Sequence, residues 1–271
     1  MLLDVQNLKV SFDTPDGVVE AVRGLDFTLA EGESLGIVGE SGSGKSQSVL
    51  ALMGLLAANA RVTGSARLHA DSGPIELIGA RSRTLNRVRG ARIAMIFQDP
   101  MTALNPHLRI ATQMTEVLTR HRGLGRRAAH AAAVAMLDAV RIPDAARRIR
   151  YFPHQFSGGM RQRVMIAMSL ACEPDILIAD EPTTALDVTV QADILDLMAE
   201  LRTRTRTALL LITHDLGVVA GQCERMLVMR RGEIVERGAI GPVFAGPSHD
   251  YTRALLAAVP RLDGPRPAPR G

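Results

Sequence analysis

The chain has 271 residues, 46% of them hydrophobic, and a formal net charge of +4. This length suits one large α/β domain, or one domain with a subdomain. No apolar run reaches the roughly 18 residues that a membrane-spanning helix needs, and the N-terminus lacks the charged-then-apolar pattern of a secretory signal. We therefore expect a cytoplasmic protein that reaches a membrane only through a partner.

Positive charge is carried almost entirely by arginine, with 30 arginines against 2 lysines. The basic clusters are short and lack interleaved aromatic residues, so we interpret them as solvated helix faces rather than a nucleic-acid surface. Cys172 and Cys223 lie too far apart in the sequence for a CxxC-type metal or redox site. We expect two reduced thiols there.

The N-terminal region predicts an antiparallel pair of strands. Residues 2–12 and 18–29 alternate apolar and polar side chains, and the turn sequence Thr14-Pro15-Asp16-Gly17 separates them. A short apolar strand is expected over 34–38 and a helix over 46–56, so a strand–loop–helix unit follows directly.

The loop of that unit has the sequence Gly39-Glu40-Ser41-Gly42-Ser43-Gly44-Lys45-Ser46. Its glycines let backbone N–H groups surround phosphate oxygens at the start of a helix. Lys45 is placed to reach the β- and γ-phosphates and Ser46 to bind Mg²⁺. The expected nucleotide contacts in this segment are Gly39, Ser41, Gly42, Ser43, Gly44, Lys45, Ser46 and Gln47.

The rest of the chain predicts alternating strands and helices, and hence a parallel sheet covered on both faces. Strands are expected over 92–97, 175–179 and 208–213. Helical patterns cover 110–151, 157–171 and 188–202. A hairpin is expected over 226–237, and the Pro-, Gly- and Arg-rich tail is expected to be frayed.

The strand over 175–179 leads into Asp180 and Glu181. Such a strand delivers acids to the carboxyl edge of a parallel sheet, where ligands bind. Asp180 is then a candidate to hold Mg²⁺, and Glu181 to orient and deprotonate an attacking water. Two acids after a strand more often serve as a helix cap and surface charge, and it is the earlier phosphate loop that favours the catalytic interpretation.

Phe156-Ser157-Gly158-Gly159-Met160-Arg161-Gln162-Arg163 is the most informative stretch. Ser157, Gly158 and Gly159 at a helix N-terminus present a hydroxyl and free N–H groups to an anion. A plain serine N-cap would explain Ser157 but not the paired glycines. Together with the phosphate loop and the Asp180-Glu181 pair, this stretch resembles the signature of the ATP-binding cassette (ABC) ATPases.

The resemblance implies an α/β fold: a P-loop NTPase cassette with a RecA-like parallel-sheet core, an N-terminal antiparallel β subdomain and a helical signature subdomain. It implies one nucleotide-binding domain over 1–262, with the helical subdomain at about 99–170, and a disordered tail over 263–271. The implied ligands are ATP and Mg²⁺.

Further site residues follow from the same resemblance. Gln98 looks like the glutamine that senses Mg²⁺ and the water, and His214 like the switch histidine that contacts the γ-phosphate. Asp187 looks like the residue that crosses a dimer interface, where Ser157, Gly158 and Gly159 would cover the partner's ATP. Phe12 looks like the aromatic that stacks on adenine, although a core strand residue fits its spacing equally well.

Several segments look like the peptide/nickel importer branch of the family, in its oligopeptide and dipeptide members. They are residues 39–56, 97–106, 156–168, 181–191 and 249–256, with 260–262. Met160 replaces the usual glutamine after Ser-Gly-Gly, a departure that this branch shares. Those subunits normally continue into a cysteine-containing tail associated with an iron–sulfur cluster, whereas this sequence stops at Gly271 without such cysteines. Either the sequence is truncated or this member lacks the tail, and no cluster is assigned.

The implied machine contains a second ABC ATPase subunit, identical or distinct, and two transmembrane permease subunits at the cytoplasmic face of the inner membrane. An extracytoplasmic binding protein would select the peptide, and related importers take nickel chelates or glutathione. A soluble ABC protein acting on nucleic acid usually carries a coiled coil, zinc cysteines or two cassettes, none of which the sequence has. A GTPase is disfavoured because no Asn-Lys-x-Asp motif occurs.

Overall fold

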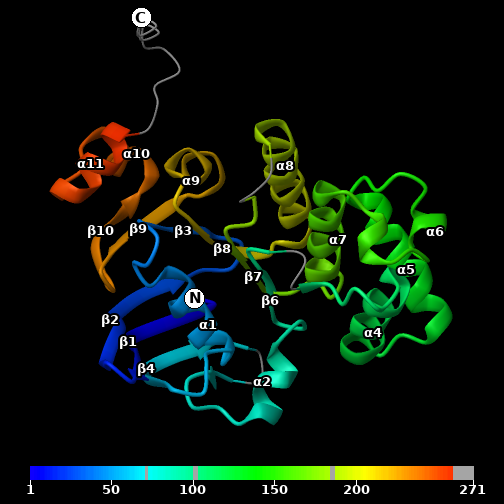
Figure 1. The fold of residues 1–271 in the computed structure, drawn as a ribbon, viewed down its shortest axis with the longest axis horizontal. Coiled ribbons are helices and arrows are strands. Elements are labelled where there is room, and N and C mark those ends of the chain that lie inside the picture. Colours follow the sequence, from blue (N-terminus) through cyan, green and yellow to red (C-terminus); the bar gives the residue numbers. More distant parts are fainter. Residues whose placement is uncertain (71–72, 100–102, 184–186, 259–271) are drawn as a thin grey trace, which may run out of the picture.

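The computed structural model describes residues 1–70, 73–99, 103–183 and 187–258. It contains a four-stranded antiparallel sheet, a six-stranded mainly parallel sheet and a group of helices beside the parallel sheet (Figure 1). The mixed α/β architecture predicted from the sequence is confirmed.

The antiparallel sheet has the order β2-β1-β4-β5. Strands β1 (Leu3–Thr14) and β2 (Gly17–Leu29) pair across the predicted turn, with Phe12 opposite Val19. Strands β4 (Ala60–Leu68) and β5 (Ile75–Glu76) were not predicted, and β4 pairs with the other side of β1. The predicted hairpin is therefore half of a larger sheet.

The six-stranded sheet has the order β10-β9-β3-β8-β7-β6. Its strands are β3 (Ser34–Val38), β6 (Ile93–Ile96), β7 (Ile176–Asp180), β8 (Ala208–Thr213), β9 (Arg225–Arg230) and β10 (Glu233–Ala239). All neighbours are parallel except β9 and β10, which form the predicted hairpin. Every residue of β3, β7 and β8 is buried, as their near-continuous apolar sequences predict.

Successive side chains of the parallel strands enter two different hydrophobic cores, because strand side chains alternate between faces. In β7, Leu177 and Ala179 pack into a core shared with the helices after β6. Ile176 and Ile178 pack on the opposite face, into a core shared with α1 and the antiparallel sheet. The sheet thus separates the two cores.

The helices are α1 (Lys45–Met53), α2 (Ser82–Val88), α4 (Ile110–Arg122), α5 (Arg126–Ala139), α6 (Ala145–Arg148), α7 (Gly158–Leu170), α8 (Val188–Thr205), α9 (Leu216–Gln222), α10 (Ile240–Ala245) and α11 (Asp250–Ala258). Helices α4 to α7 form the lobe at the right of Figure 1. The sequence correctly predicts helix from Ile110 and from Ser157, which caps α7. It extends α1 too far, because that helix stops at Gly54, whose φ is 59°.

Within the described ranges, no helix combines the length and the apolar character needed to cross a bilayer. The predicted tail, 263–271, and the last residues of the predicted domain lie outside the described residues. The domain boundaries therefore stay predictions.

Candidate functional site

The phosphate loop joins β3 to α1 and has a shape that two of its glycines make possible. A Cβ on Gly39 would lie 2.1 Å from the Met229 carbonyl oxygen, and one on Gly44 would lie 2.2 Å from that of Ala21. Both residues also have positive φ, 155° and 100°. Any side chain there would force the loop away from β2 and β9, so glycine is required at both positions.

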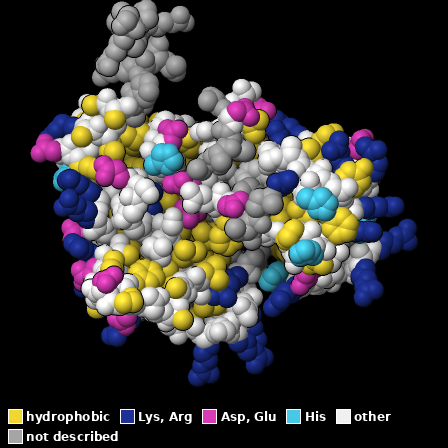
Figure 2. All heavy atoms as spheres, in the orientation of Figure 1, with side chains coloured by type: hydrophobic (Ala, Val, Ile, Leu, Met, Phe, Trp, Pro, Cys, Tyr) yellow, Lys and Arg dark blue, Asp and Glu magenta, His cyan; other side chains and the backbone are white. Residues whose placement is uncertain are grey.

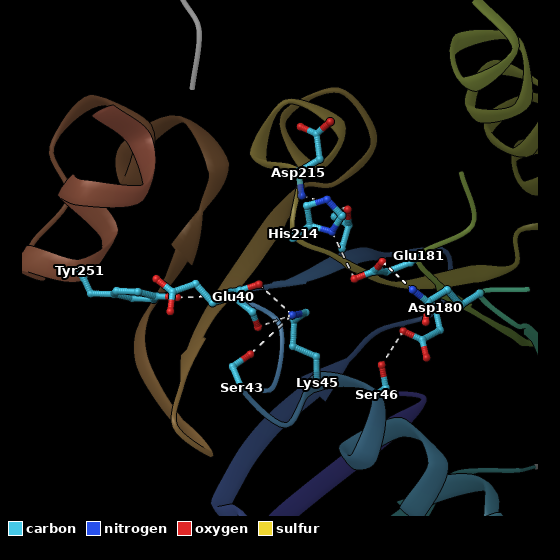
Figure 3. Close-up of polar contacts among 12 residues, drawn as sticks. Glu40, Ser43, Lys45, Ser46, Asp180, Glu181, His214, Asp215 and Tyr251 are labelled. Atoms are coloured by element: carbon cyan, nitrogen blue, oxygen red, sulfur yellow. Dashed lines mark hydrogen bonds and ion pairs between the residues drawn. The ribbon is translucent and has the colours of Figure 1, made fainter. Parts of the chain in front are cut away.

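Lys45 is buried beneath this loop, with only 5% of its surface exposed. Its Nζ atom donates hydrogen bonds to the carbonyl oxygens of Gly39, at 2.7 Å, and Glu40, at 2.9 Å (Figure 3). Burial lowers the pKa of Lys45, while the carboxylates of Glu181 and Asp180 oppose that shift. The ammonium is thus held beside the loop among groups that stabilise its charge.

Ser46 and Asp180 meet at the carboxyl edge of the parallel sheet. The Ser46 hydroxyl donates a hydrogen bond of 2.9 Å to Oδ1 of Asp180. Asp180 is the last residue of β7 and is 6% exposed. Burial raises its pKa, against the hydrogen bond from Ser46. A desolvated carboxylate beside a hydroxyl is a set of hard oxygen donors, which is what Mg²⁺ prefers.

Glu181 lies between two side chains from neighbouring strand ends. Gln98, which follows β6, donates from Nε2 to Glu181 Oε2 at 3.0 Å, and His214 Nδ1, after β8, lies 3.2 Å from Oε1. The φ of Glu181 is 47°, a left-handed conformation that is rare for a non-glycine residue and is concentrated at functional sites. Three parallel strands therefore deliver these three predicted residues to one point.

The signature residues lie on another element. Ser157 caps α7, accepting a hydrogen bond of 3.4 Å from the Met160 amide, and both Ser157 and Gly158 are exposed. Asp187 is also exposed and caps α8, accepting from the Val190 amide at 3.0 Å. These residues are available at the surface of the chain, as the predicted role opposite a partner's nucleotide requires.

Gln162 links the signature helix to the catalytic edge. Its Nε2 atom donates a hydrogen bond to the carbonyl oxygen of Pro182, next to Glu181, and its side chain is 2% exposed. Its place inside the signature stretch does not by itself predict this contact.

Phe12, by contrast, is half-buried and packs against the core shared by α1 and the antiparallel sheet. Its stacking on adenine stays a prediction.

Sequence reasoning missed one contact of the loop. The Glu40 amide donates a hydrogen bond of 3.0 Å to the phenol oxygen of Tyr251, on α11 near the C-terminus (Figure 3). The sequence only marked the segment containing Tyr251 as similar to the importer branch. No local pattern connects two residues so far apart in the chain.

The fold and the site together define an ATP-binding cassette. The ABC transporter family model matches residues 22–184, and the chain belongs to that family. It is 57% identical to the oligopeptide transport ATP-binding protein OppD of Haemophilus influenzae, over 97% of this chain and 80% of that protein. It is also 51% identical to the glutathione import ATP-binding protein GsiA of Pectobacterium atrosepticum, over 99% of this chain and 44% of that protein.

A solved structure shares the fold and the class of activity. The dimeric cassette MJ0796, in a post-hydrolysis state bound to ADP and Pi, matches with a TM-score of 0.76 and 26% identity, over 88% of this chain and 99% of that one. The chain is accordingly an ATPase of the ABC type.

Proposed function

We propose that this chain is the ATP-hydrolysing subunit of an importer that takes up oligopeptides or dipeptides. The observation that carries the proposal is the carboxylate of Glu181, held between Gln98 and His214 next to the phosphate loop, in a chain 57% identical to an oligopeptide transport subunit. The site supports ATP hydrolysis, and the similarity supports the peptide substrate.

In the proposed reaction, Lys45 leaves the Gly39 and Glu40 carbonyl oxygens and binds the β- and γ-phosphates. Glu181 accepts a proton from a water whose oxygen forms a bond to the γ-phosphorus as the bond to the β-phosphate oxygen breaks. The products are ADP and inorganic phosphate. His214 orients the Glu181 carboxylate and faces the γ-phosphate.

Ser46 and Asp180 would hold Mg²⁺, which supplies charge neutralisation for the phosphates when bound. Among the described residues, no group of three or more His, Cys, Asp or Glu side chains could hold a metal by itself. That fits Mg²⁺, which usually takes one or two protein oxygens and completes its shell with phosphate and water oxygens.

Each ATP would be closed between the phosphate loop of one subunit and Ser157, Gly158 and Gly159 of another. The exposed position of Ser157 and Asp187 supports this arrangement, and so does the dimeric state of the structural relative. The second subunit is identical or a related ATPase, and the isolated chain is expected to hydrolyse ATP slowly.

One of the two membrane permease subunits would dock at an apolar groove of about 300 Å³ between the sheet and the helical lobe. Leu55, Phe97, Leu104, Met165 and Met168 are among its lining residues. Hydrophobic side chains gather in the middle of the face in Figure 2, and basic side chains protrude along its right and lower margins. This docking would place the chain at the cytoplasmic face of the inner membrane, with an extracytoplasmic protein selecting the peptide.

A transport assay tests the proposal. A strain lacking this chain should lose uptake of labelled di- and oligopeptides and regain it with the wild-type gene but not with Glu181→Gln. Restored uptake of glutathione or a nickel chelate, with peptide uptake unchanged, would favour the related importers instead; the similarity to the glutathione importer subunit makes glutathione the first alternative to measure.

A further inference from the structure

Tyr251 contacts the phosphate loop from the far end of the chain. It lies on α11, 211 residues after Glu40, and its phenol oxygen accepts the hydrogen bond of 3.0 Å from the Glu40 amide. The side chain is 7% exposed. The phosphate-loop motif is complete without this contact, and the proposed reaction does not use the phenol.

The surroundings of Tyr251 hold its ring in one position. The guanidinium of Arg230 lies 4.8 Å from the ring centroid, and the Tyr251 amide donates to His249 Nδ1 at 3.1 Å. The carboxylate of Glu236, in β10, accepts hydrogen bonds from the amides of Ser248, at 2.6 Å, and His249, at 3.2 Å. These hydrogen bonds hold the turn before α11 against the sheet, and they therefore restrict the position of the Tyr251 side chain.

Tyr251 and Lys45 form hydrogen bonds at opposite edges of one peptide group. The plane between Gly39 and Glu40 offers the Gly39 carbonyl to Lys45, at 2.7 Å, and the Glu40 N–H to Tyr251. When Lys45 turns to the phosphates it releases the carbonyl, so one of the two restraints on this plane is lost. The hydrogen bond to Tyr251 does not depend on Lys45 and can remain.

We propose that Tyr251 is a positioning residue of the ATP site, whose phenol holds the Gly39–Glu40 peptide plane in the phosphate-accepting shape after Lys45 has moved to the nucleotide. The inference rests on the proposed ATP site. Because a loop held in its bound shape loses less freedom on binding, the contact acts on nucleotide affinity rather than on the chemical step. The segment from β10 to α11 is then a working part of the ATP site.

The test uses a variant that removes one oxygen atom. Tyr251→Phe keeps the ring packed beneath Arg230 and removes only the phenol hydroxyl, which accepts from the Glu40 amide and also hydrogen-bonds the Glu40 side chain. Tyr151, which makes an edge contact with Phe156, is the other tyrosine of the chain, so Tyr151→Phe is the matched control. We expect Tyr251→Phe to raise the KM and Kd for ATP about three- to tenfold, the effect of losing one such hydrogen bond, with kcat and melting temperature nearly unchanged.

A spectroscopic readout follows from the composition. The chain has no tryptophan and two tyrosines, so in Tyr151→Phe the emission of Tyr251 alone reports on the loop during an ATP titration. We expect that emission to change with the same midpoint as ATP binding. Wild-type affinity in Tyr251→Phe, or a lower melting temperature with unchanged KM, would overturn the positioning role.

Lys45→Ala separates the two levels of inference. If it abolishes ATP binding while Tyr251→Phe binds as the wild type does, only the role of Tyr251 is wrong. If Lys45→Ala also binds ATP normally, the ATP site itself is wrong, and the inference about Tyr251 falls with it.

Discussion

The Nδ1 atom of His214 lies 3.2 Å from Oε1 of Glu181, and the histidine side chain is 60% exposed while the glutamate is 15% exposed. The exposed His214 thus contacts the largely buried Glu181 at the carboxylate that we expect to activate water. With Gln98 on the other carboxylate oxygen, both oxygens of Glu181 have a partner that fixes their direction.

Replacing Glu181 by glutamine should lower kcat by about 10²- to 10⁴-fold, because the amide cannot accept the proton of the attacking water. ATP binding should persist, and the ATP-bound dimer should accumulate. Phosphate release and size-exclusion chromatography with ATP measure the two effects. Glu233→Gln, an exposed position on β10, is the control, and full turnover in Glu181→Gln would contradict the assignment.

Lys45→Ala should weaken ATP binding strongly, whereas Lys9→Ala, at the other lysine of the chain, should not. Burial lowers the pKa of Lys45 in the folded state. The unfolded chain then binds more protons in the window below the ordinary lysine pKa, so this residue adds stability as pH rises through that window. Without nucleotide, the melting temperature of the wild type relative to that of Lys45→Ala should rise as pH increases from neutral to alkaline. A difference in melting temperature that stays constant with pH would refute this.

Asp180→Asn should stabilise the nucleotide-free protein while abolishing Mg²⁺-dependent turnover. Burial raises the pKa of Asp180, so the folded state binds more protons above the ordinary aspartate pKa and the ionised carboxylate lowers stability at neutral pH. The amide removes this cost and still accepts the Ser46 hydrogen bond. Each kcal/mol by which the free energy of unfolding increases should raise Tm by about 2–4 °C.

The control for that experiment is Asp16→Asn, an exposed position in the first turn. Its melting temperature should match the wild type near neutral pH. An unchanged or lower melting temperature in Asp180→Asn would show that desolvation of this carboxylate is not a cost to the fold.

Ser157→Gly should leave ATP binding to the isolated chain intact and lower turnover of the dimer at least about tenfold, by removing a hydroxyl that we expect to face the partner's ATP. Glycine replaces serine at an N-cap at a cost of only a few tenths of a kcal/mol, so α7 should stay folded. Equilibrium binding and steady-state hydrolysis test this pair of expectations. Weaker binding in the isolated chain would contradict the role across the interface.

The parallel sheet was predictable because its strands are short apolar runs that end in chemically distinctive residues, such as Asp180 and His214. Strand β4 was not, because Gly64 and polar side chains interrupt its alternation. A Cβ on Gly64 would lie 2.4 Å from the Asn7 carbonyl oxygen, and the register of β1 and β4 shifts between Gln6 and Lys9. The glycine that interrupts the strand pattern is therefore required by the close pairing of β4 with β1, and that pairing is known only from the fold.

The site divides in a similar way. Motif spacing predicted Lys45, Ser46, Asp180 and Glu181, and the fold brings them to one edge of the sheet. The contact between Glu40 and Tyr251 joins a backbone amide to a side chain on the last described helix. Almost every residue type has a backbone N–H donor, so the residue types do not indicate which donor forms such a contact, and the sequence could not predict it.

The hydrogen bond from Gln162 to the Pro182 carbonyl joins α7 directly to the segment that follows Glu181. Gln162 belongs to the helix that we expect to cover the neighbouring subunit's nucleotide. Pro182 follows Glu181, which we expect to activate the water that attacks this chain's own nucleotide. A shift of the strand end as phosphate leaves would pull directly on that helix. In the proposed dimer, this one buried amide would therefore connect the two ATP sites.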